Sequence, residues 1–128
     1  MGRILLIDDD NGFTSFLSGY IQDRFPLLRV DICNSPVAAL QRIKSGGYDL
    51  LLIDLEMPSI DGLKLLGFAI QSGMDKNRIV ILSGRDANVL HDICPMGTCL
   101  AVLNKFEARQ KAVLDMIFNS LHKKAGGL

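Results

Sequence analysis

Four short apolar segments of this chain each lead into a polar side chain that can take part in chemistry. The segments are residues 4–7, 50–53, 79–82 and 100–103. The polar residues that follow them are Asp8 with Asp9, Asp54, Ser83, and Lys105 after the intervening Asn104. A short apolar run bounded by polar or turn residues is typical of a strand buried on both faces. Parallel strands present their carboxyl ends to one crevice, so we expect carboxylates, a hydroxyl and an ammonium group to meet there.

The acidic residues of this group suit a divalent cation. Three carboxylates at one sheet edge repel one another, and a cation relieves that repulsion. Magnesium prefers a few carboxylates, a backbone carbonyl and retained waters, with a phosphate oxygen completing its octahedron. Asp9 and Asp54 suit direct ligation of Mg²⁺, and Asp8 can act through a water molecule.

The same group suits phosphoryl chemistry. A metal ion, the ammonium of Lys105 and the hydroxyl of Ser83 around a carboxylate form a receptor for phosphate oxygens. A carboxylate can itself attack phosphorus and give an aspartyl phosphate. Asp54 is the best candidate nucleophile, because it stands alone at its strand end and Met57 with Pro58 forces a turn after it. Each of these residues by itself is also typical of a turn, a helix cap or a solvated surface, so the hypothesis depends on their joint order.

Composition excludes several classes of protein. At 128 residues the chain has the size of one domain with a good core. Lys and Arg together number 14, as do Asp and Glu, so the net charge gives no electrostatic case for binding nucleic acid or an anionic membrane. No apolar run approaches the roughly 18 residues of a membrane span, and the first residues do not resemble a secretory signal. We therefore expect a cytoplasmic protein.

The spacing of the cysteine and histidine residues does not predict a metal-binding or catalytic site. Cys33, Cys94 and Cys99 are odd in number and contain no CxxC pair, so we expect reduced thiols packed as small hydrophobic groups. His91 and His122 lie far apart on predicted helices, and neither has a partner at ligand spacing. We expect no metal-binding or catalytic role for either histidine.

The elements that must position the polar residues alternate between strands and helices. Apolar runs predict strands near residues 3–7, 28–32, 49–53, 78–82 and 99–103. Apolar spacing and end signals predict helices after the N-caps Asn11 and Ser35, from Asp61, over 89–93 and over about 107–123. Five such units indicate a parallel sheet with helices on both faces. We expect one domain over residues 1–124, with 125–128 a C-terminal tail or the start of a linker.

With these residues in view, the chain resembles the receiver domain of two-component response regulators over essentially its whole length. The matching segments are ILLIDDD at 4–10, DLLLIDLEMPSIDGL at 49–63, IVILSG at 79–84 and LNKF at 103–106. The second is the most specific, with a strand-end Asp followed by Met-Pro and Asp-Gly. The resemblance implies a flavodoxin-like (βα)5 fold, a doubly wound parallel sheet of five strands in the order 2-1-3-4-5.

The resemblance also implies roles for single residues. Asp54 would accept a phosphoryl group from a histidine kinase or phosphotransfer protein, Ser83 would bind a phosphoryl oxygen, and Lys105 would pair with the phosphoryl group. The implied Mg²⁺ ligands are Asp8, Asp9, Asp54 and the backbone carbonyl of Glu56. The domain would then be a phosphorylation-dependent binding switch and not an enzyme that turns over a substrate.

Three residues depart from the usual receiver pattern. Phe106 follows Lys105 where the family has a cis-proline; a cis non-proline bond costs about 3 kcal/mol, so this bond is either trans or strained. Val102 stands in place of the family's switch aromatic, and Gly84 follows Ser83 where Ala is common. We therefore expect an intact acceptor site with an altered readout.

Two further predictions concern surfaces. Glu56 and Arg85 lie two residues beyond Asp54 and Ser83, and we expect them to form an ion pair that screens water and slows loss of phosphate; the alternative is two solvated side chains. The last helix has a wide apolar arc, made by Val113, Leu114, Met116, Ile117, Phe118 and Leu121. One stripe of this arc must cover the sheet, and the rest predicts a contact for a homodimer or an effector, unless neighbouring helices cover it.

Other functions account for fewer of these residues. Haloacid-dehalogenase-type phosphatases need an Asp two residues after the nucleophile, where this chain has Glu56, and lack the Asp8–Asp9 pair. A flavodoxin needs a phosphate loop rich in Thr, Ser and Gly after the first strand. An unphosphorylated, receiver-like interaction module stays the main alternative, although such modules normally lose acidic residues that this chain keeps.

Overall fold

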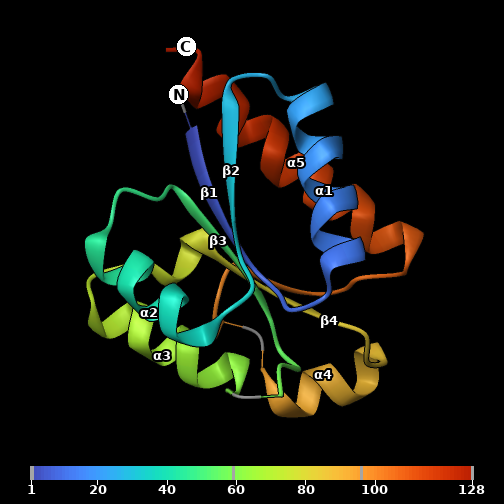
Figure 1. The fold of residues 1–128 in the computed structure, drawn as a ribbon. Coiled ribbons are helices and arrows are strands. Elements are labelled where there is room, and N and C mark those ends of the chain that lie inside the picture. Colours follow the sequence, from blue (N-terminus) through green and yellow to red (C-terminus); the bar gives the residue numbers. More distant parts are fainter. Residues whose placement is uncertain (1, 59, 96, 128) are drawn as a thin grey trace.

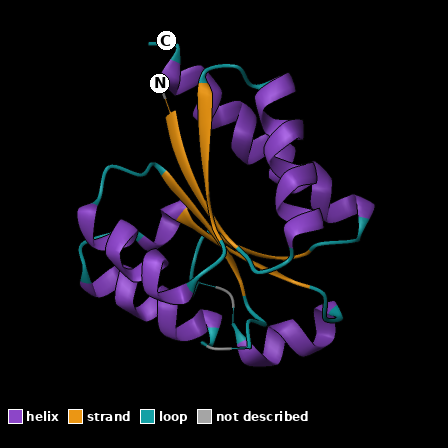
Figure 2. Ribbon diagram, viewed as in Figure 1, coloured by secondary structure: helices purple, strands orange, loops and turns teal. Residues whose placement is uncertain are grey.

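The computed structural model describes residues 2–58, 60–95 and 97–127, except for the side chains of residues 87, 88, 91, 108 and 109. Within these residues the strands are β1 (Gly2–Ile7), β2 (Leu28–Cys33), β3 (Leu50–Asp54), β4 (Ile79–Ser83) and β5 (Ala101–Asn104). The α-helices are α1 (Asn11–Arg24), α2 (Pro36–Ser45), α3 (Gly62–Gln71), α4 (Ala87–Ile93) and α5 (Ala108–Ala125), and a short 3₁₀ helix, η1 (Lys76–Arg78), precedes β4. Strands and helices alternate along the chain (Figures 1 and 2), as the sequence predicts.

The strands form one parallel sheet in the order β2-β1-β3-β4-β5. In its register Ile7 pairs with Cys33 on one side and with Ile53 on the other, and Asp54 pairs with Leu82. This arrangement confirms the predicted flavodoxin-like, doubly wound sheet. The strand order reverses between β1 and β3, so the carboxyl ends of these two central strands open into the crevice where ligands bind in such sheets.

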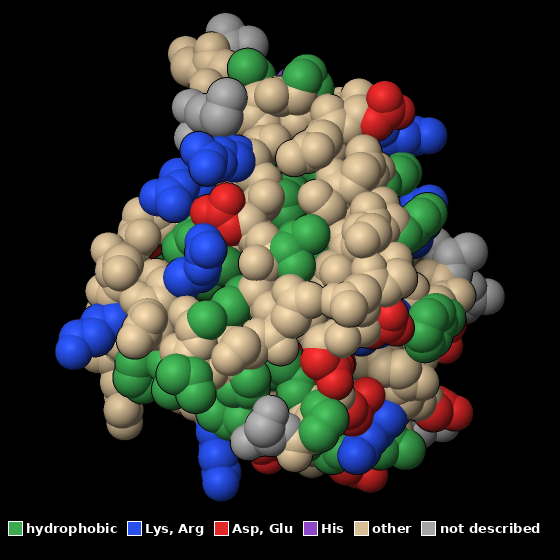
Figure 3. All heavy atoms as spheres, in the orientation of Figure 1, with side chains coloured by type: hydrophobic (Ala, Val, Ile, Leu, Met, Phe, Trp, Pro, Cys, Tyr) green, Lys and Arg blue, Asp and Glu red, His purple; other side chains and the backbone are tan. Residues whose placement is uncertain are grey.

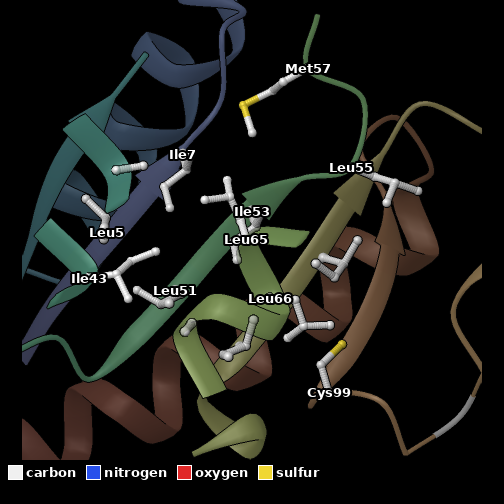
Figure 4. Close-up of a cluster of buried hydrophobic side chains, with 14 of the residues drawn as sticks. Leu5, Ile7, Ile43, Leu51, Ile53, Leu55, Met57, Leu65, Leu66 and Cys99 are labelled. Atoms are coloured by element: carbon white, nitrogen blue, oxygen red, sulfur yellow. The ribbon is translucent and has the colours of Figure 1, made fainter. Parts of the chain in front are cut away.

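Two hydrophobic layers sandwich the sheet. Helices α1 and α5 cover one face, and α2, α3 and α4 cover the other (Figure 1). Successive side chains of a strand point to opposite faces, so Ile4 and Leu6 pack with α1 and α5, whereas Leu5 and Ile7 pack with α2 and α3 (Figure 4). All four side chains are fully buried. The continuous apolar runs are therefore explained by burial on both faces.

The element boundaries differ slightly from the prediction, and the differences matter for the polar residues. Strands β3 and β4 extend one residue further than expected, so Asp54 and Ser83 are the last residues of their strands. The prediction that Asn11 caps α1 is wrong. Asp10 is the N-cap, because its Oδ1 accepts the backbone N–H of Phe13 at 3.1 Å. Ser35 occupies the N-cap position of α2, as expected, but its side chain makes no capping hydrogen bond, and Pro36 is the first helical residue.

Gly62 allows the start of α3 to lie directly against the end of β3. A Cβ at this position would stand 2.5 Å from the backbone oxygen of Asp54 and 2.7 Å from Cα of Leu55. Asp61 precedes it as the N-cap and accepts the N–H of Leu63 at 2.9 Å. The Asp-Gly pair thus ends the loop after Asp54 at a fixed place.

The three cysteines are buried free thiols, as predicted. Cys33, Cys94 and Cys99 are all buried in the layer under α2, α3 and α4. The ring of His122 lies edge-on to Phe25, with 5.7 Å between ring centres. The prediction for His91 falls on a side chain outside the described residues.

The apolar arc of α5 is divided between the core and solvent. Phe118 and Leu114 are buried against the sheet. Met116 and Val113 are exposed, at 72% and 38%. Neighbouring helices therefore do not cover the whole arc.

Acidic and basic side chains are unevenly distributed on the face of the molecule that Figure 3 shows. Figure 3 shows acidic side chains gathered on the lower right of the face in view, toward the side where the strands end, and basic side chains mainly on the upper left. None of the helices that the structure describes combines the length and hydrophobicity that a bilayer crossing requires.

Candidate functional site

The carboxyl ends of β1, β3 and β5 bring Asp8, Asp54 and Lys105 into direct contact. Nζ of Lys105 lies 2.5 Å from Oδ2 of Asp8 and 3.4 Å from Oδ1 of Asp54. The lysine side chain is only 7% exposed and its ammonium lies 4.7 Å from the centre of the Phe13 ring on α1. Burial by itself lowers the pKa of Lys105, but the hydrogen bond to Asp8 and the charges of both carboxylates outweigh it and raise the pKa. The lysine therefore stays protonated at this edge.

Asp9 completes an acidic cluster with Asp8 and Asp54. One carboxylate oxygen from each residue lies within 4.8 Å of the others, and Asp9 is the exposed member. The backbone N–H of Asp10 donates to Oδ1 of Asp8 at 3.0 Å, and the N–H of Glu56 donates to Oδ1 of Asp54 at 3.2 Å, so both carboxylates are held in place. Several carboxylate oxygens at this spacing, one of them facing solvent, are the hard donors that Mg²⁺ takes while keeping part of its water shell. The donor set therefore fits this ion.

Asp54 is a buried carboxyl group whose ionisation is unfavourable. Burial is the main cause, and the charge of Asp8 adds to it; together they raise the pKa of Asp54 to about 7 against the opposing charge of Lys105. Additional positive charge near the cluster would favour the ionised carboxylate. A bound cation would therefore favour the form of Asp54 that acts as a nucleophile.

Ser83 lies at the end of β4, but its hydroxyl is directed to Glu56. Oγ donates to the Glu56 carboxylate, at 2.8 Å from Oε1 and 2.7 Å from Oε2, and it accepts the N–H of Arg85 at 3.0 Å. The backbone N–H of Gly84 also donates to Oε1 of Glu56, at 3.2 Å. Sequence reasoning missed this role of the Glu56 side chain. The signal was its place two residues beyond Asp54, on the turn that faces the end of β4.

The predicted ion pair at the mouth of the site is confirmed. Nε of Arg85 lies 3.8 Å from Oε2 of Glu56, and the two side chains are 50% and 33% exposed. Such an exposed pair contributes little to the free energy of folding. The pair lies beside Ser83, whose hydroxyl contacts both residues.

Asn104 is a second residue that the sequence reasoning missed. Its side chain is buried and joins two loops: Nδ2 donates to the carbonyl of Arg85 at 2.7 Å, and Oδ1 accepts the N–H of Phe106 at 2.7 Å. The backbone N–H of Lys105 donates to the carbonyl of Ser83 at 2.8 Å. These bonds fix the backbone on both sides of Lys105. The described residues contain no cis peptide bond, so the Lys105–Phe106 bond is trans.

The position of the usual switch aromatic lies beside an open pocket. Val102 on β5 is partly buried, and it lines a pocket of about 250 Å³ together with Leu90, Cys94 and Leu103. A valine is much smaller than an aromatic ring, and space remains between α4 and β5. Position 102 therefore supplies no ring that could move in step with Ser83.

Comparisons with known proteins agree with this geometry. The family model described as "Response regulator receiver domain" matches residues 4–117. A protein-glutamate methylesterase/protein-glutamine glutaminase of Treponema denticola is 30% identical over 125 residues, which cover 94% of this chain and 33% of that protein. The chain spans a third or less of the length of the first three curated relatives it matches.

Solved structures show the same fold. The response regulator TrrA of Thermotoga maritima, in complex with Mg(2+)-BeF, has a TM-score of 0.76 at 24% identity, covering 94% of this chain and 99% of that one. TrrA in the complex with the histidine kinase ThkA has a TM-score of 0.69 at 24% identity, covering 94% and 98%. The family model covers most of the chain and the strand order agrees, so the chain belongs to the response regulator receiver domains of two-component signalling.

Proposed function

We propose that Asp54 accepts a phosphoryl group in a Mg²⁺-dependent reaction and that the domain then changes its binding of a partner. The observation that carries this proposal is the contact of Lys105 with both Asp8 and Asp54 beside three convergent carboxylates. A buried ammonium and an acidic cluster around one strand-end carboxylate provide both signs of charge that phosphoryl transfer requires. Membership of the family supports the same assignment.

Each residue has a definite part in the proposed transfer. The carboxylate of Asp54 attacks phosphorus, the bond from phosphorus to the donor's imidazole nitrogen breaks, and that nitrogen keeps the electron pair. Lys105 stabilises the negative charge on the phosphoryl oxygens, and the hydroxyl of Ser83 donates to one of them. Asp8, Asp9, Asp54 and the backbone carbonyl of Glu56 would hold Mg²⁺. When bound, Mg²⁺ supplies positive charge to the phosphoryl oxygens and the carboxylates.

The proposed donor is a histidine kinase or a phosphotransfer protein. The Thermotoga maritima regulator with a similar fold was solved in complex with a histidine kinase, which supports a kinase partner for this chain. The domain turns over no separate substrate in this proposal, because the phosphoryl group stays on Asp54. We place the receiver domain at residues 1–124, with 125–128 as a tail or the start of a linker, and we expect it to act in the cytoplasm.

The test is phosphorylation by acetyl phosphate with Mg²⁺, followed by intact-mass measurement of the wild type, Asp54→Ala and Asp23→Ala. Asp23 is an exposed carboxylate on α1 and serves as the matched control. We expect one phosphate on the wild type and on Asp23→Ala, none on Asp54→Ala, and none when Mg²⁺ is chelated. A wild type that takes up no phosphate would contradict the proposal and favour an unphosphorylated interaction module.

The exposed part of α5 is the proposed contact for a second copy or an effector. Met116 and Val113 lie with the exposed Leu100 beside a pocket of about 660 Å³ at the opposite end of the sheet from Asp54. Sedimentation across a concentration series, with and without phosphate, tests the dimer. A strict monomer under both conditions would leave the effector as the proposed partner of this surface.

A further inference from the structure

Glu56 holds an unusual set of contacts for a side chain at the mouth of a site. Its carboxylate accepts the Ser83 hydroxyl through both oxygens, accepts the N–H of Gly84, and pairs with Arg85. These three partners are consecutive residues at the end of β4. One carboxylate from the loop after β3 thus binds the last residue of β4 and the first two residues of the segment that leads to α4.

One of the donors that Glu56 occupies, the Ser83 hydroxyl, is the group that the proposed function assigns to a phosphoryl oxygen, and the Gly84 N–H lies next to it on the same carboxylate. A serine hydroxyl has a single proton to donate, and a backbone N–H has one as well. The Ser83 hydroxyl therefore cannot donate its proton fully to both Glu56 and a phosphoryl oxygen at the same time. Glu56 is also an anion, so it repels the charge that phosphorylation adds to Asp54, two residues away.

We infer that the carboxylate of Glu56 competes with the phosphoryl group on Asp54 for the Ser83 hydroxyl and the Gly84 N–H. This inference rests on the proposed function and adds a means of regulation to it. Before phosphorylation Glu56 fills the anion position at the end of β4. Phosphorylation displaces it, and the ion pair with Arg85 can persist at the mouth.

This competition has a structural consequence in a chain without the switch aromatic. Glu56 is held at the end of β4 by the Ser83 hydroxyl, which is shared between both carboxylate oxygens, and by the Gly84 N–H, and this contact is lost when Ser83 turns to the phosphoryl group. The carbonyl of Arg85 is bound to Asn104, so the change reaches the end of β5. Movement of Glu56 out of the site would thus be the response to phosphorylation, in place of the movement of an aromatic ring at position 102, where this chain has Val102.

The first experiment measures the affinity of the purified chain for beryllium fluoride in the presence of Mg²⁺, as a non-hydrolysed stand-in for the phosphoryl group. The variants are Glu56→Ala, which removes the competing anion, and Glu56→Gln, which keeps an acceptor but no charge. We expect Kd to fall about tenfold in Glu56→Ala, the equivalent of one hydrogen bond to a charged group, and by a smaller factor in Glu56→Gln. Glu107→Ala is the matched control, because this exposed glutamate makes no side-chain bond at the cap of α5, and its Kd should equal that of the wild type.

Two readouts make the inference independent of affinity alone. The amide proton resonance of Gly84, recorded without beryllium fluoride, should shift in Glu56→Ala because its carboxylate acceptor is lost. In a Ser83→Ala background the gain from Glu56→Ala should shrink, since the contested hydroxyl is gone. An unshifted Gly84 resonance would show that the contact does not exist in solution.

The remaining outcomes separate this inference from the proposed function. If the wild type binds beryllium fluoride and Glu56→Ala binds it equally or more weakly, Glu56 does not compete and the inference is wrong, while the proposed function stands. If no variant binds beryllium fluoride or gains phosphate, the acceptor function itself is wrong and the inference falls with it.

Discussion

The ring of Phe106 lies against Gly84, with Cε2 3.4 Å from the point where a Cβ of residue 84 would stand. Both residues depart from the usual receiver pattern, and the structure shows that the two departures are neighbours. Phe106 is 74% exposed, so the pair forms part of the outer rim of the site.

We predict that Gly84→Ala is stabilising. The new methyl group would lie at ordinary contact distance from the Phe106 ring, and Gly84 does not have the left-handed backbone that penalises alanine. Loss of glycine freedom in the unfolded chain should then raise the free energy of unfolding by about 0.5 kcal/mol. Urea denaturation measures this change directly.

Gly62→Ala is the opposite case and serves as the control for that substitution. Its Cβ would meet the backbone of Asp54 and Leu55 at 2.5 and 2.7 Å, and backbone cannot rotate away as a side chain can. We expect a loss of about 2 kcal/mol or more. A Gly84→Ala variant that is as unstable as Gly62→Ala would show that the Phe106 ring does not move to accommodate the new methyl group.

The raised pKa of Asp54 predicts that this residue contributes less to stability at neutral than at mildly acidic pH. Burial, then Asp8, raise this pKa from 3.8 to about 7, so the folded chain keeps a proton that the unfolded chain releases between about pH 4 and pH 7. The unfolded state binds fewer protons in that window, and the contribution of Asp54 to the free energy of unfolding therefore falls as pH rises through it. Above about pH 7 the contribution is level.

Asp54→Asn cannot ionise and should remove this part of the pH dependence. We expect it to exceed the wild type in stability by on the order of 2 kcal/mol at pH 8, and by little at pH 4. Added Mg²⁺ should stabilise the wild type by about 1.4 kcal/mol at ten times its Kd, and should stabilise the variant less. Parallel pH profiles of the two proteins, by urea denaturation without Mg²⁺, would contradict the assignment.

Asn104 should prove important for stability and for the placement of Lys105. Removing its side chain leaves the carbonyl of Arg85 and the N–H of Phe106 without these partners, which costs about 1–3 kcal/mol at a buried position. We expect Asn104→Ala to lose that amount in denaturation experiments and to take up phosphate more slowly. Asn104→Asp keeps the acceptor for Phe106 but turns a carboxylate oxygen toward the carbonyl of Arg85, so near neutral pH it should be at least as unstable as Asn104→Ala.

Asn77→Ala is the control for this substitution, because Asn77 is an exposed residue of η1 at the other end of the sheet. Its change in the free energy of unfolding should stay within about 0.5 kcal/mol. Equal stability of the Asn77 and Asn104 variants would mean that water replaces the bonds of Asn104.

The sequence was sufficient for the sheet and for the residues at its edge, because both follow from local patterns. Continuous apolar runs such as 50–53 require burial on both faces, and that requirement places Asp54 at a strand end. The directions in which the polar side chains point could not be predicted from such local patterns. Ser83 and Glu56 are 27 residues apart, and nothing in the spacing shows that this hydroxyl binds this carboxylate. In the sequence Asn104 is only the residue between the last apolar run and Lys105, because its two partners become its neighbours only after folding.

The ion pair of Glu56 and Arg85 should lengthen the life of the aspartyl phosphate by partly screening the attacking water. The pair is exposed, and exposed pairs contribute up to about 1 kcal/mol, so we expect Arg85→Ala to lose phosphate roughly threefold faster than the wild type. The measurement is the decay of the phosphorylated mass after removal of acetyl phosphate. Arg78→Ala removes a similar exposed pair with Asp49 at the opposite end of the sheet and should leave the decay rate unchanged. Equal decay rates in the wild type and Arg85→Ala would show that the ion pair does not screen the aspartyl phosphate from the attacking water.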